Sequence, residues 1–229
     1  MTAPIVFDIE GTIGDITFVR NVLFPYARER TSRHLAAHWN DASIQAIVAD
    51  ARSASGKPLS SAADAATQFN EWIDQDRKIT PLKALQGILW REGYASGELK
   101  AHLYPDAITA FERWSKAGHS LYIYSSGSIE AQKLYLAYSI AGDLTGLFQG
   151  YFDTTAGAKA DAASYEKIAS AIGAAPGTPV FFSDAVAEVT AAQQAGFKAY
   201  CVDRARPPAW QDLSGPFPII GSFETITRL

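Results

Sequence analysis

The sequence predicts an α/β protein with a Rossmann-like parallel sheet that is interrupted, after its first strand, by an all-helical insertion. Two observations indicate this fold class. From about residue 105 onward, short β-branched and aromatic runs alternate with helical patterns, as in a parallel sheet covered by helices. Between residues 15 and about 117 no convincing strand pattern occurs, although a parallel crossover needs only about a dozen residues.

The first strand is the apolar run Ile5-Val6-Phe7, which is rich in residues that favour strands. The run stops at Asp8, and Gly11-Thr12 then turns the chain. Asp8 and Glu10 therefore stand at the carboxyl end of the strand, the edge at which open α/β sheets bind ligands. Two carboxylates beside a glycine suit a divalent cation and a phosphate group. The alternative role for Asp8 is a cap on the following turn.

The next part of the chain predicts helices only. Phe18, Val22 and Tyr26 recur at helical spacing, and Pro25 inside this pattern predicts a kink or a break. Three further helices are predicted over residues 42–54, 59–75 and 80–97. We therefore expect a helical cap domain at residues 15–101, inserted into an α/β core made of residues 1–14 and 102–229.

The remaining core elements follow in regular alternation. Helices are predicted over residues 105–117, 129–138, 162–172 and 185–195. Strands are predicted over residues 119–125, 147–152, 179–183 and 197–202, with a last edge strand at 218–220. This order indicates one sheet with helices between its strands.

Composition narrows the class of protein. The chain has 229 residues, of which 48% are hydrophobic and 19% charged, as in ordinary soluble globular proteins. Its formal net charge of −4 argues against a nucleic-acid binder. No apolar run approaches the ~20 residues of a membrane span, and the first strand begins too early for a signal peptide. A single cysteine, Cys201, fits a reducing compartment and is expected to be inert core. We expect a cytoplasmic monomer.

Polar residues also follow later strands. Ser125 and Ser126 follow a strand and are suited to cradling an anion, unless they only cap the next helix. Asp184 follows another strand and is a suitable third carboxylate for a cation, with helix capping as its alternative. Lys159 precedes a helix and is suited to neutralising a phosphoryl group, unless it is a solvated surface lysine.

The order of these residues resembles the haloacid-dehalogenase-like superfamily of phosphohydrolases. The resemblance implies that Asp8 is the nucleophile, Ser125 a phosphate-binding hydroxyl, Lys159 the basic residue and Asp184 a magnesium ligand. The helical insertion resembles the cap of that superfamily. One position departs from the pattern, because Glu10 stands where the superfamily usually has aspartate. The backbone carbonyl at that position is still available to the metal.

Longer runs are spread over both the cap and the core: Asp8-Ile9-Glu10-Gly11-Thr12, Phe24-Pro25-Tyr26, Leu82-Lys83-Ala84-Leu85-Gln86-Gly87 with Trp90, Tyr122-Ile123-Tyr124-Ser125-Ser126-Gly127-Ser128 with Glu130-Ala131-Gln132-Lys133-Leu134, and Phe152-Asp153-Thr154. They resemble acireductone synthase, the bifunctional enolase-phosphatase of methionine salvage. The match loosens after Thr154 and around Pro207-Pro208.

That resemblance implies a small phosphate substrate, 2,3-diketo-5-methylthiopentyl-1-phosphate, which is enolised and then dephosphorylated to 1,2-dihydroxy-3-keto-5-methylthiopentene. It implies Mg²⁺ as cofactor, held at Asp8, Glu10 and Asp184. Asp8 would form an aspartyl phosphate, and Glu10 would act as general acid and base. Lys159, Ser125 and Ser126 would bind the phosphate oxygens. The enolisation step rests on resemblance alone, with Mg²⁺ as Lewis acid and Glu10 as the candidate base.

Other interpretations remain open. A phosphatase of the same superfamily that acts on another small phosphate ester would show the same core residues, since the cap selects the substrate. A catalytically silent phosphate-binding domain would not need a nucleophile with an acid partner. His34 and His38 have a spacing that can bind zinc, but without a third ligand nearby in sequence we interpret them as ordinary helix residues. Glu188 either lies beside the metal site or faces solvent.

Overall fold

The computed structural model describes residues 2–227, and the chain forms two compact units. The core unit comprises the chain up to Thr17 and again from Lys100 onward, and the helical unit comprises Phe18–Leu99. The domain boundaries expected from the sequence fall after residues 14 and 101. The helical unit therefore begins shortly after the segment that carries Asp8 and Glu10.

Within the described residues, the core unit contains a seven-stranded sheet in the order β3-β2-β1-β4-β5-β7-β6. All neighbouring strands are parallel except β6 and β7. The strands are β1 (Ile5–Phe7), β2 (Leu121–Tyr124), β3 (Phe148–Phe152), β4 (Val180–Ser183), β5 (Lys198–Val202), β6 (Gln211–Asp212) and β7 (Ile219–Ile220). The α/β fold class predicted from the sequence is confirmed. The first strand lies inside the sheet, between β2 and β4.

The sheet edge at β6 and β7 differs from the prediction. The sequence predicted one edge strand near residue 218, whereas Gln211–Asp212 also pairs with Ile219–Ile220, in antiparallel fashion. Two residues are too few to show an alternating pattern, so β6 left no signal in the sequence.

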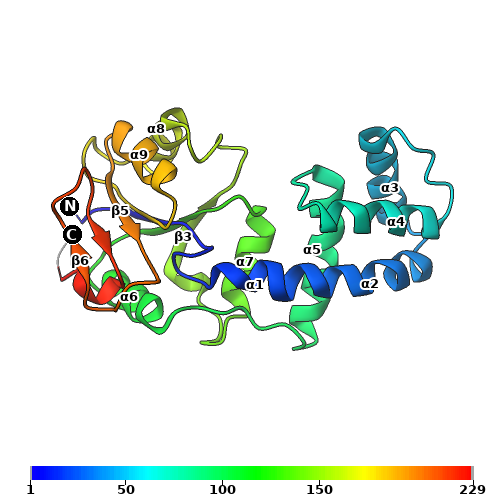
Figure 1. Cartoon of the computed structure of the whole chain (residues 1–229), viewed down its shortest axis with the longest axis horizontal. Coiled ribbons are helices and arrows are strands. Elements are labelled where there is room, and N and C mark those ends of the chain that lie inside the picture. Colours follow the sequence, from blue (N-terminus) through cyan, green and yellow to red (C-terminus); the bar gives the residue numbers. More distant parts are fainter. Residues whose placement is uncertain (1, 228–229) are drawn as a thin grey trace. The chain divides into compact units, whose positions relative to one another are not determined.

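Helices cover both faces of the sheet because successive strand residues point to opposite sides. Val6 and Phe181 pack toward α8 (Ala162–Ala171) and α9 (Val186–Gln194). Phe7 and Phe182 point the other way, with ring centroids 5.6 Å apart, toward α6 (Pro105–Lys116). Figure 1 shows α8 and α9 on one side of the sheet and α6 on the other. The sheet is thus buried on both faces, as its apolar strands require.

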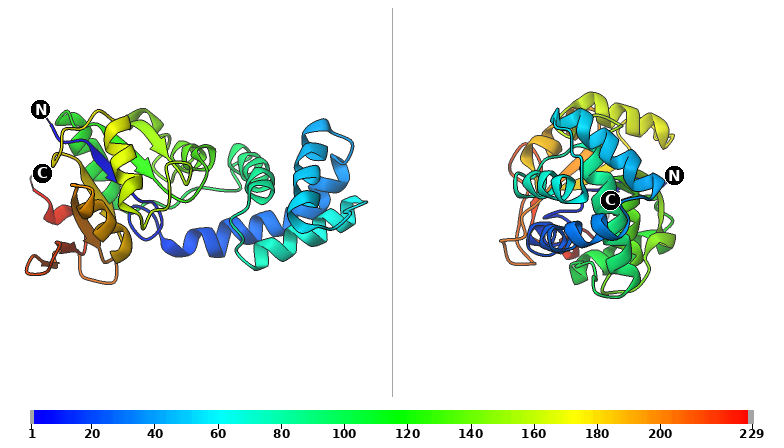
Figure 2. Two further views of the ribbon diagram at one scale, coloured as in Figure 1. Left: turned by 90° about the horizontal axis from the view of Figure 1, so that it is seen from above. Right: turned by 90° about the vertical axis from the view of Figure 1, so that its right-hand side faces the viewer.

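The helical unit contains η1 (Val19–Leu23), α2 (Phe24–Ala37), α3 (Ala42–Ser55), α4 (Ala62–Asp74) and α5 (Thr80–Ala95), while α1 (Ile16–Phe18) spans the unit boundary. Helix α2 packs against α4 and α5, and α3 packs against α5 (Figure 2). The hydrophobic core of the helical unit includes the buried residues Leu35, Val48, Phe69 and Leu85. The unit therefore has a core of its own.

The break expected at Pro25 takes a specific form. Segment η1 is a turn of π-helix, and α2 starts directly after it with Pro25 in its first turn. Leu23 and Phe24 have helical backbone angles, so η1 continues directly into α2, and Pro25, which lacks an N–H, cannot donate to a carbonyl of the preceding turn.

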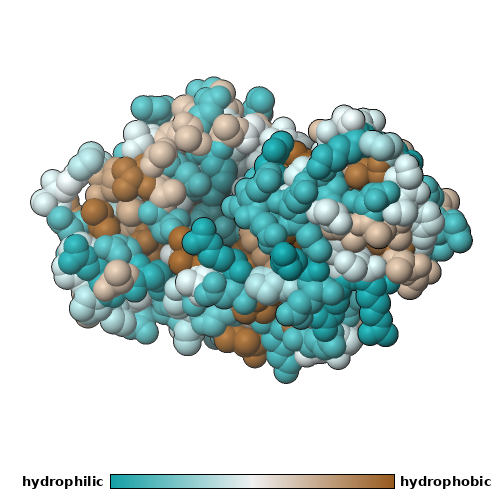
Figure 3. Space-filling model, turned by 45° about the vertical axis from the view of Figure 1, so that its right-hand side comes forward, coloured by the Kyte–Doolittle hydropathy of each residue, from teal (hydrophilic) through white to brown (hydrophobic). Residues whose placement is uncertain are grey.

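Exposed large hydrophobic side chains are scattered over the described surface: Ile16, Val22, Ile129, Tyr138, Ile140, Val186 and Leu213. On the face shown in Figure 3, hydrophobic residues form separate patches within a mostly hydrophilic surface. Across residues 2–227, no helix has both the length and the apolar character needed to cross a bilayer.

Candidate active site

The six site residues predicted from the sequence lie together in the core unit. Phe7 pairs with Ile123 in β2 and with Phe182 in β4, so the segments that follow these strands start side by side. They line a cleft of about 160 Å³, which also includes Ile16 and Glu188. The predicted residues in its lining are Asp8, Glu10, Ser125, Ser126, Lys159 and Asp184.

Lys159 reaches from the loop before α8 to the end of β1. Its Nζ forms ion pairs with Asp8 Oδ1 and, at 2.6 Å, with Glu188 Oε2. Only 11% of the lysine side chain is exposed, so Lys159 is not a solvated surface residue. Glu188 in turn accepts a hydrogen bond from Ser183 Oγ at 2.8 Å. Glu188 therefore faces the cleft rather than solvent.

The loop that carries Lys159 is held by three hydroxyl groups. Tyr124, Ser164 and Tyr165 donate hydrogen bonds to the carbonyls of Gly157, Ala158 and Lys159, respectively. The three distances are 3.1, 2.8 and 2.8 Å. Consecutive carbonyls are thus fixed from β2 and α8, and these bonds place the backbone of Lys159.

Thr12 is a site residue that the sequence analysis missed. Its hydroxyl donates to Asp8 Oδ2 at 3.2 Å and accepts the backbone N–H of Asp184 at 2.9 Å. The residue is fully buried. One hydroxyl therefore couples the end of β1 to the end of β4. Its partner lies 172 positions away in the chain, so no local pattern could have revealed the contact.

Gly11 is required by a close approach. Its φ is +76°, and a Cβ at this position would lie 2.2 Å from Asp184 Oδ2. A positive φ and the lack of space both exclude other residues. The glycine lets the loop after β1 run directly against the Asp184 carboxylate.

The loop after β2 that carries Ser125 and Ser126, here called the serine loop, does not use these two residues to cap the next helix. Helix α7 (Ile129–Ala137) is capped by Ser128, whose Oγ accepts the N–H of Ala131 at 3.3 Å. Similarly, the N-cap of α9 is Ala185 rather than Asp184. The capping alternatives for Ser125, Ser126 and Asp184 therefore do not apply.

Gln132, on α7, holds the serine loop in place through hydrogen bonds. Its Nε2 donates to the carbonyls of Gly127 and Phe152, both at 2.8 Å, and the residue is 1% exposed. The same amide lies 3.4 Å from the carbonyl of Ser125. A single side chain on α7 thus ties the end of β3 to the loop that carries the two serines.

The charges in the cleft are unbalanced, with four carboxylates against one ammonium group. Burial, followed by the charge of Asp8, raises the pKa of Asp184 to about 6. The same two causes raise the pKa of Glu188. Burial opposes the charge of Lys159, but Asp8 and Glu188 outweigh it and raise the pKa of the lysine. This excess of negative charge would repel a phosphate dianion, so phosphate binding here calls for a compensating cation.

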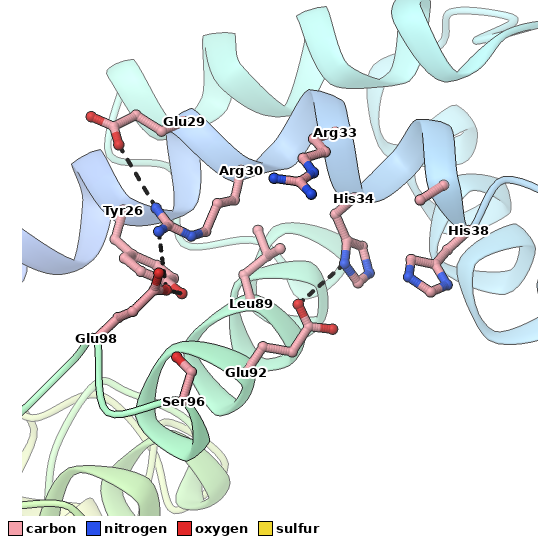
Figure 4. A pocket seen from close by; sticks show the side chains of 11 residues that line it. Tyr26, Glu29, Arg30, Arg33, His34, His38, Leu89, Glu92, Ser96 and Glu98 are labelled. Atoms are coloured by element: carbon pink, nitrogen blue, oxygen red, sulfur yellow. Dashed lines mark hydrogen bonds and ion pairs between the residues drawn. The ribbon is translucent and has the colours of Figure 1, made fainter.

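The helical unit holds a separate groove of about 640 Å³ between α2 and α5 (Figure 4). His34 and His38 lie side by side there, with ring centroids 4.6 Å apart. The Nδ1 atom of His34 lies 3.4 Å from the Glu92 carboxylate, and that of His38 lies 2.8 Å from Asp41. Among residues 2–227, no group of three or more His, Cys, Asp or Glu side chains is placed to hold a metal ion.

Cys201 lies in β5, buried in the core unit. Burial, followed by the charges of Asp184 and Asp203, raises the pKa of its thiol to about 11. A thiol with a raised pKa is a poor nucleophile at neutral pH.

The class of protein follows from the fold and the cleft. A family model described as haloacid dehalogenase-like hydrolase matches residues 5–196. The 2-haloacid dehalogenase of Pseudomonas syringae pv. Tomato has a similar fold, with a TM-score of 0.59 over 99% of this chain and 96% of that one. At 15% identity, that similarity concerns the fold alone.

More similar proteins narrow the class. The chain is 47% identical over 226 residues to enolase-phosphatase E1 of Alcanivorax borkumensis, which covers 99% of this chain and 98% of the relative. It is 49% identical over 210 residues to enolase-phosphatase E1 of Klebsiella pneumoniae, covering 91% and 92%. The UTR4 protein of Saccharomyces cerevisiae has a crystal structure with a TM-score of 0.83 and 30% identity, covering 99% of this chain and all of that one. The chain therefore belongs to the enolase-phosphatase E1 family of haloacid dehalogenase-like hydrolases, and it is a phosphatase.

Proposed function

We propose that this phosphatase is the enolase-phosphatase of L-methionine salvage. It converts 2,3-diketo-5-methylthiopentyl-1-phosphate to 1,2-dihydroxy-3-keto-5-methylthiopentene and phosphate. The observation that supports this most is the placement of Asp8, with Lys159 on one carboxylate oxygen and the Thr12 hydroxyl on the other. The name shared by the relatives supports the choice of substrate.

The donor set of the cleft fits Mg²⁺. The carboxylates of Asp8 and Asp184 and the backbone carbonyl of Glu10 would hold the ion. Such hard oxygen donors suit Mg²⁺, which is usually bound by one or two carboxylates and keeps several waters. When bound, the ion screens the phosphate charge that the four carboxylates of the cleft would otherwise repel.

The side chains then divide the phosphatase chemistry. Asp8 attacks phosphorus and displaces the enol oxygen, and the phosphoryl group is then held on Asp8 as an aspartyl phosphate. Glu10 donates a proton to that leaving oxygen and then takes one from the water that releases phosphate. Lys159, Ser125 and Ser126 bind the phosphate oxygens.

Enolisation requires a base near a carbon beside the substrate carbonyl, and we assign this role to Glu10. Its side chain lines the cleft and is partly exposed, so it can meet a substrate held by its phosphate group. We assign the inserted helical unit the role of a cap that selects the tail of the substrate.

An anaerobic assay with the diketo phosphate and Mg²⁺ tests the function. Enol absorbance and released phosphate are followed together, with and without a chelator. We expect enol formation followed by phosphate release, both dependent on the metal. The Asp8→Asn variant should lose phosphate release by about three orders of magnitude or more. Asp212→Asn, which changes a half-buried carboxylate on β6 that does not line the cleft, should match the unchanged protein.

Phosphate release from simple esters without turnover of the diketone would contradict the substrate assignment. That result would favour the alternative, a phosphatase of the same superfamily acting on another small phosphate ester. No phosphate release from any ester would contradict the role of Asp8 as well.

A further inference from the structure

Ile16 is the apolar exception in the cleft. The other seven residues that line the cleft carry carboxylate, hydroxyl or ammonium groups. Ile16 is 56% exposed, whereas isoleucine is among the residues most often buried. A single exposed isoleucine elsewhere would need no explanation. Here, however, the exposed isoleucine is part of the lining of an otherwise polar cleft.

The backbone before Ile16 is anchored to the core unit, and the residue after it bonds back to this anchored segment. The N–H of Asp15 donates to His102 Nδ1 at 3.1 Å. The Asp15 carboxylate accepts the N–H of Thr17 at 2.8 Å, and this bond is the main cause that lowers the pKa of Asp15. Two residues before Asp15, the carbonyl of Ile13 accepts the N–H of Tyr104 at 2.9 Å. The exposure of Ile16 is therefore held by its neighbours and is not the property of a loose loop.

The size of the cleft indicates what Ile16 meets. Its volume of about 160 Å³ is below the roughly 300–1,000 Å³ of clefts that enclose a whole drug-sized ligand. Such a cleft has room for a phosphate group and the atoms next to it, so a longer substrate must extend past the mouth. An apolar segment that lies against Ile16 there removes apolar surface from water on both partners.

We propose that Ile16 is a specificity-determining residue that contacts an apolar segment of the substrate close to the phosphoryl group. The proposal rests on the proposed function, because it takes Asp8 and its neighbours as the phosphate site. It implies that the core unit itself, and not only the helical unit, distinguishes phosphate esters with an alkyl chain from those without one.

The test uses two probes that cannot be hydrolysed, methylphosphonate and pentylphosphonate. Their dissociation constants are measured by calorimetry in Mg²⁺ for the unchanged protein and three variants. The variants are Ile16→Ala, Ile16→Leu and Ile140→Ala. Ile140 is the matched control, because it is the same residue type with 54% exposure in the same unit but does not line the cleft.

The quantity compared is the ratio of the two dissociation constants. We expect the unchanged protein to prefer pentylphosphonate by about tenfold, the usual size of a small apolar contact. Ile16→Ala should reduce this ratio severalfold, while Ile16→Leu and Ile140→Ala should keep it. Calorimetry reports binding directly, so a change in the ratio cannot come from a changed rate of chemistry.

The possible results separate the two proposals. If Ile16→Ala keeps the full preference for the longer chain, or Ile140→Ala loses it equally, the role of Ile16 is wrong while the phosphate site stands. If neither phosphonate binds the unchanged protein, the proposed phosphate site itself is wrong, and the role of Ile16 falls with it.

Discussion

At the scale of single residues, the site depends on how Asp8 is held. Lys159 contacts one of its carboxylate oxygens and Thr12 the other, so the side chain is fixed at both atoms. A nucleophile held in one orientation avoids the entropy cost of finding it during the reaction. Thr12 also reaches Asp184, which makes its hydroxyl a link between the proposed nucleophile and a proposed metal ligand.

Replacing Thr12 with valine tests this link. The shapes are nearly equal, but the Asp184 N–H loses its acceptor and Asp8 loses a donor. We expect the free energy of unfolding to fall by about 1–3 kcal/mol, the usual cost of an unpaired buried group. We also expect kcat for phosphate release to fall, because Asp8 is less well oriented. Urea unfolding and steady-state kinetics measure the two effects.

Thr67→Val is the matched control for this variant. Thr67 is exposed on α4, and its hydroxyl only donates to the carbonyl of Ala63. It should change neither stability nor kcat appreciably. Equal behaviour of the two variants would contradict a specific role for Thr12.

At the scale of elements, the cleft is made by loops at strand ends, and each loop is held by a neighbouring element. The Lys159 loop is held from β2 and α8, and the serine loop is held from α7 through Gln132. Loops that bind phosphate must keep their N–H and hydroxyl groups in place before the ligand arrives. The helices therefore serve the site as well as the core.

Replacing Gln132 with leucine should loosen the serine loop. The carbonyl of Gly127 would lose the Gln132 donor and that of Phe152 would keep only the Ser125 N–H, so we expect a loss of about 1–3 kcal/mol in the free energy of unfolding. The KM for phosphate esters should rise severalfold, because Ser125 and Ser126 are no longer held in position. Gln193→Leu is the control, since its amide makes one exposed bond to Pro216. An unchanged KM in Gln132→Leu would contradict the role of this side chain.

At the scale of the whole molecule, the sheet order explains why distant residues meet. Strand β1 lies between β2 and β4, so its end adjoins the ends of both strands, although each of them is more than a hundred residues from β1 in the chain. The helical unit is inserted between β1 and β2. The insertion thus leaves the central strands in register.

Much of this arrangement was predictable from the sequence. The buried strands are short runs of β-branched and aromatic residues, and the residues that follow β1, β2 and β4 are polar at the edge where such sheets bind ligands. That rule was enough to group Asp8, Ser125 and Asp184. The long stretch without a strand pattern after β1 was enough to indicate an inserted module.

The residues that hold the site were not predictable in the same way. Thr12 and Gln132 act through backbone groups that are distant in sequence, and a threonine in a turn or a glutamine in a helix carries no pattern of its own. The two-residue strand β6 is likewise defined by its pairing with β7 and not by a pattern of its own. Sequence patterns report which face of an element is buried, but not which side chain fixes a loop.

The measurement that tests the central claim most directly looks for the phosphoryl group on Asp8. The Glu10→Gln variant is mixed with p-nitrophenyl phosphate and Mg²⁺, quenched in acid, and analysed by intact mass and peptide mapping. This ester needs no proton donor to leave, whereas release of phosphate from Asp8 still needs the missing base.

We predict one added phosphoryl group per chain, on the peptide that contains Asp8, and none when Asp8→Asn is combined with Glu10→Gln. A phosphoryl group on a different residue would contradict the account. Steady release of phosphate by Glu10→Gln at the rate of the unchanged protein, with no phosphorylated chain, would contradict it equally.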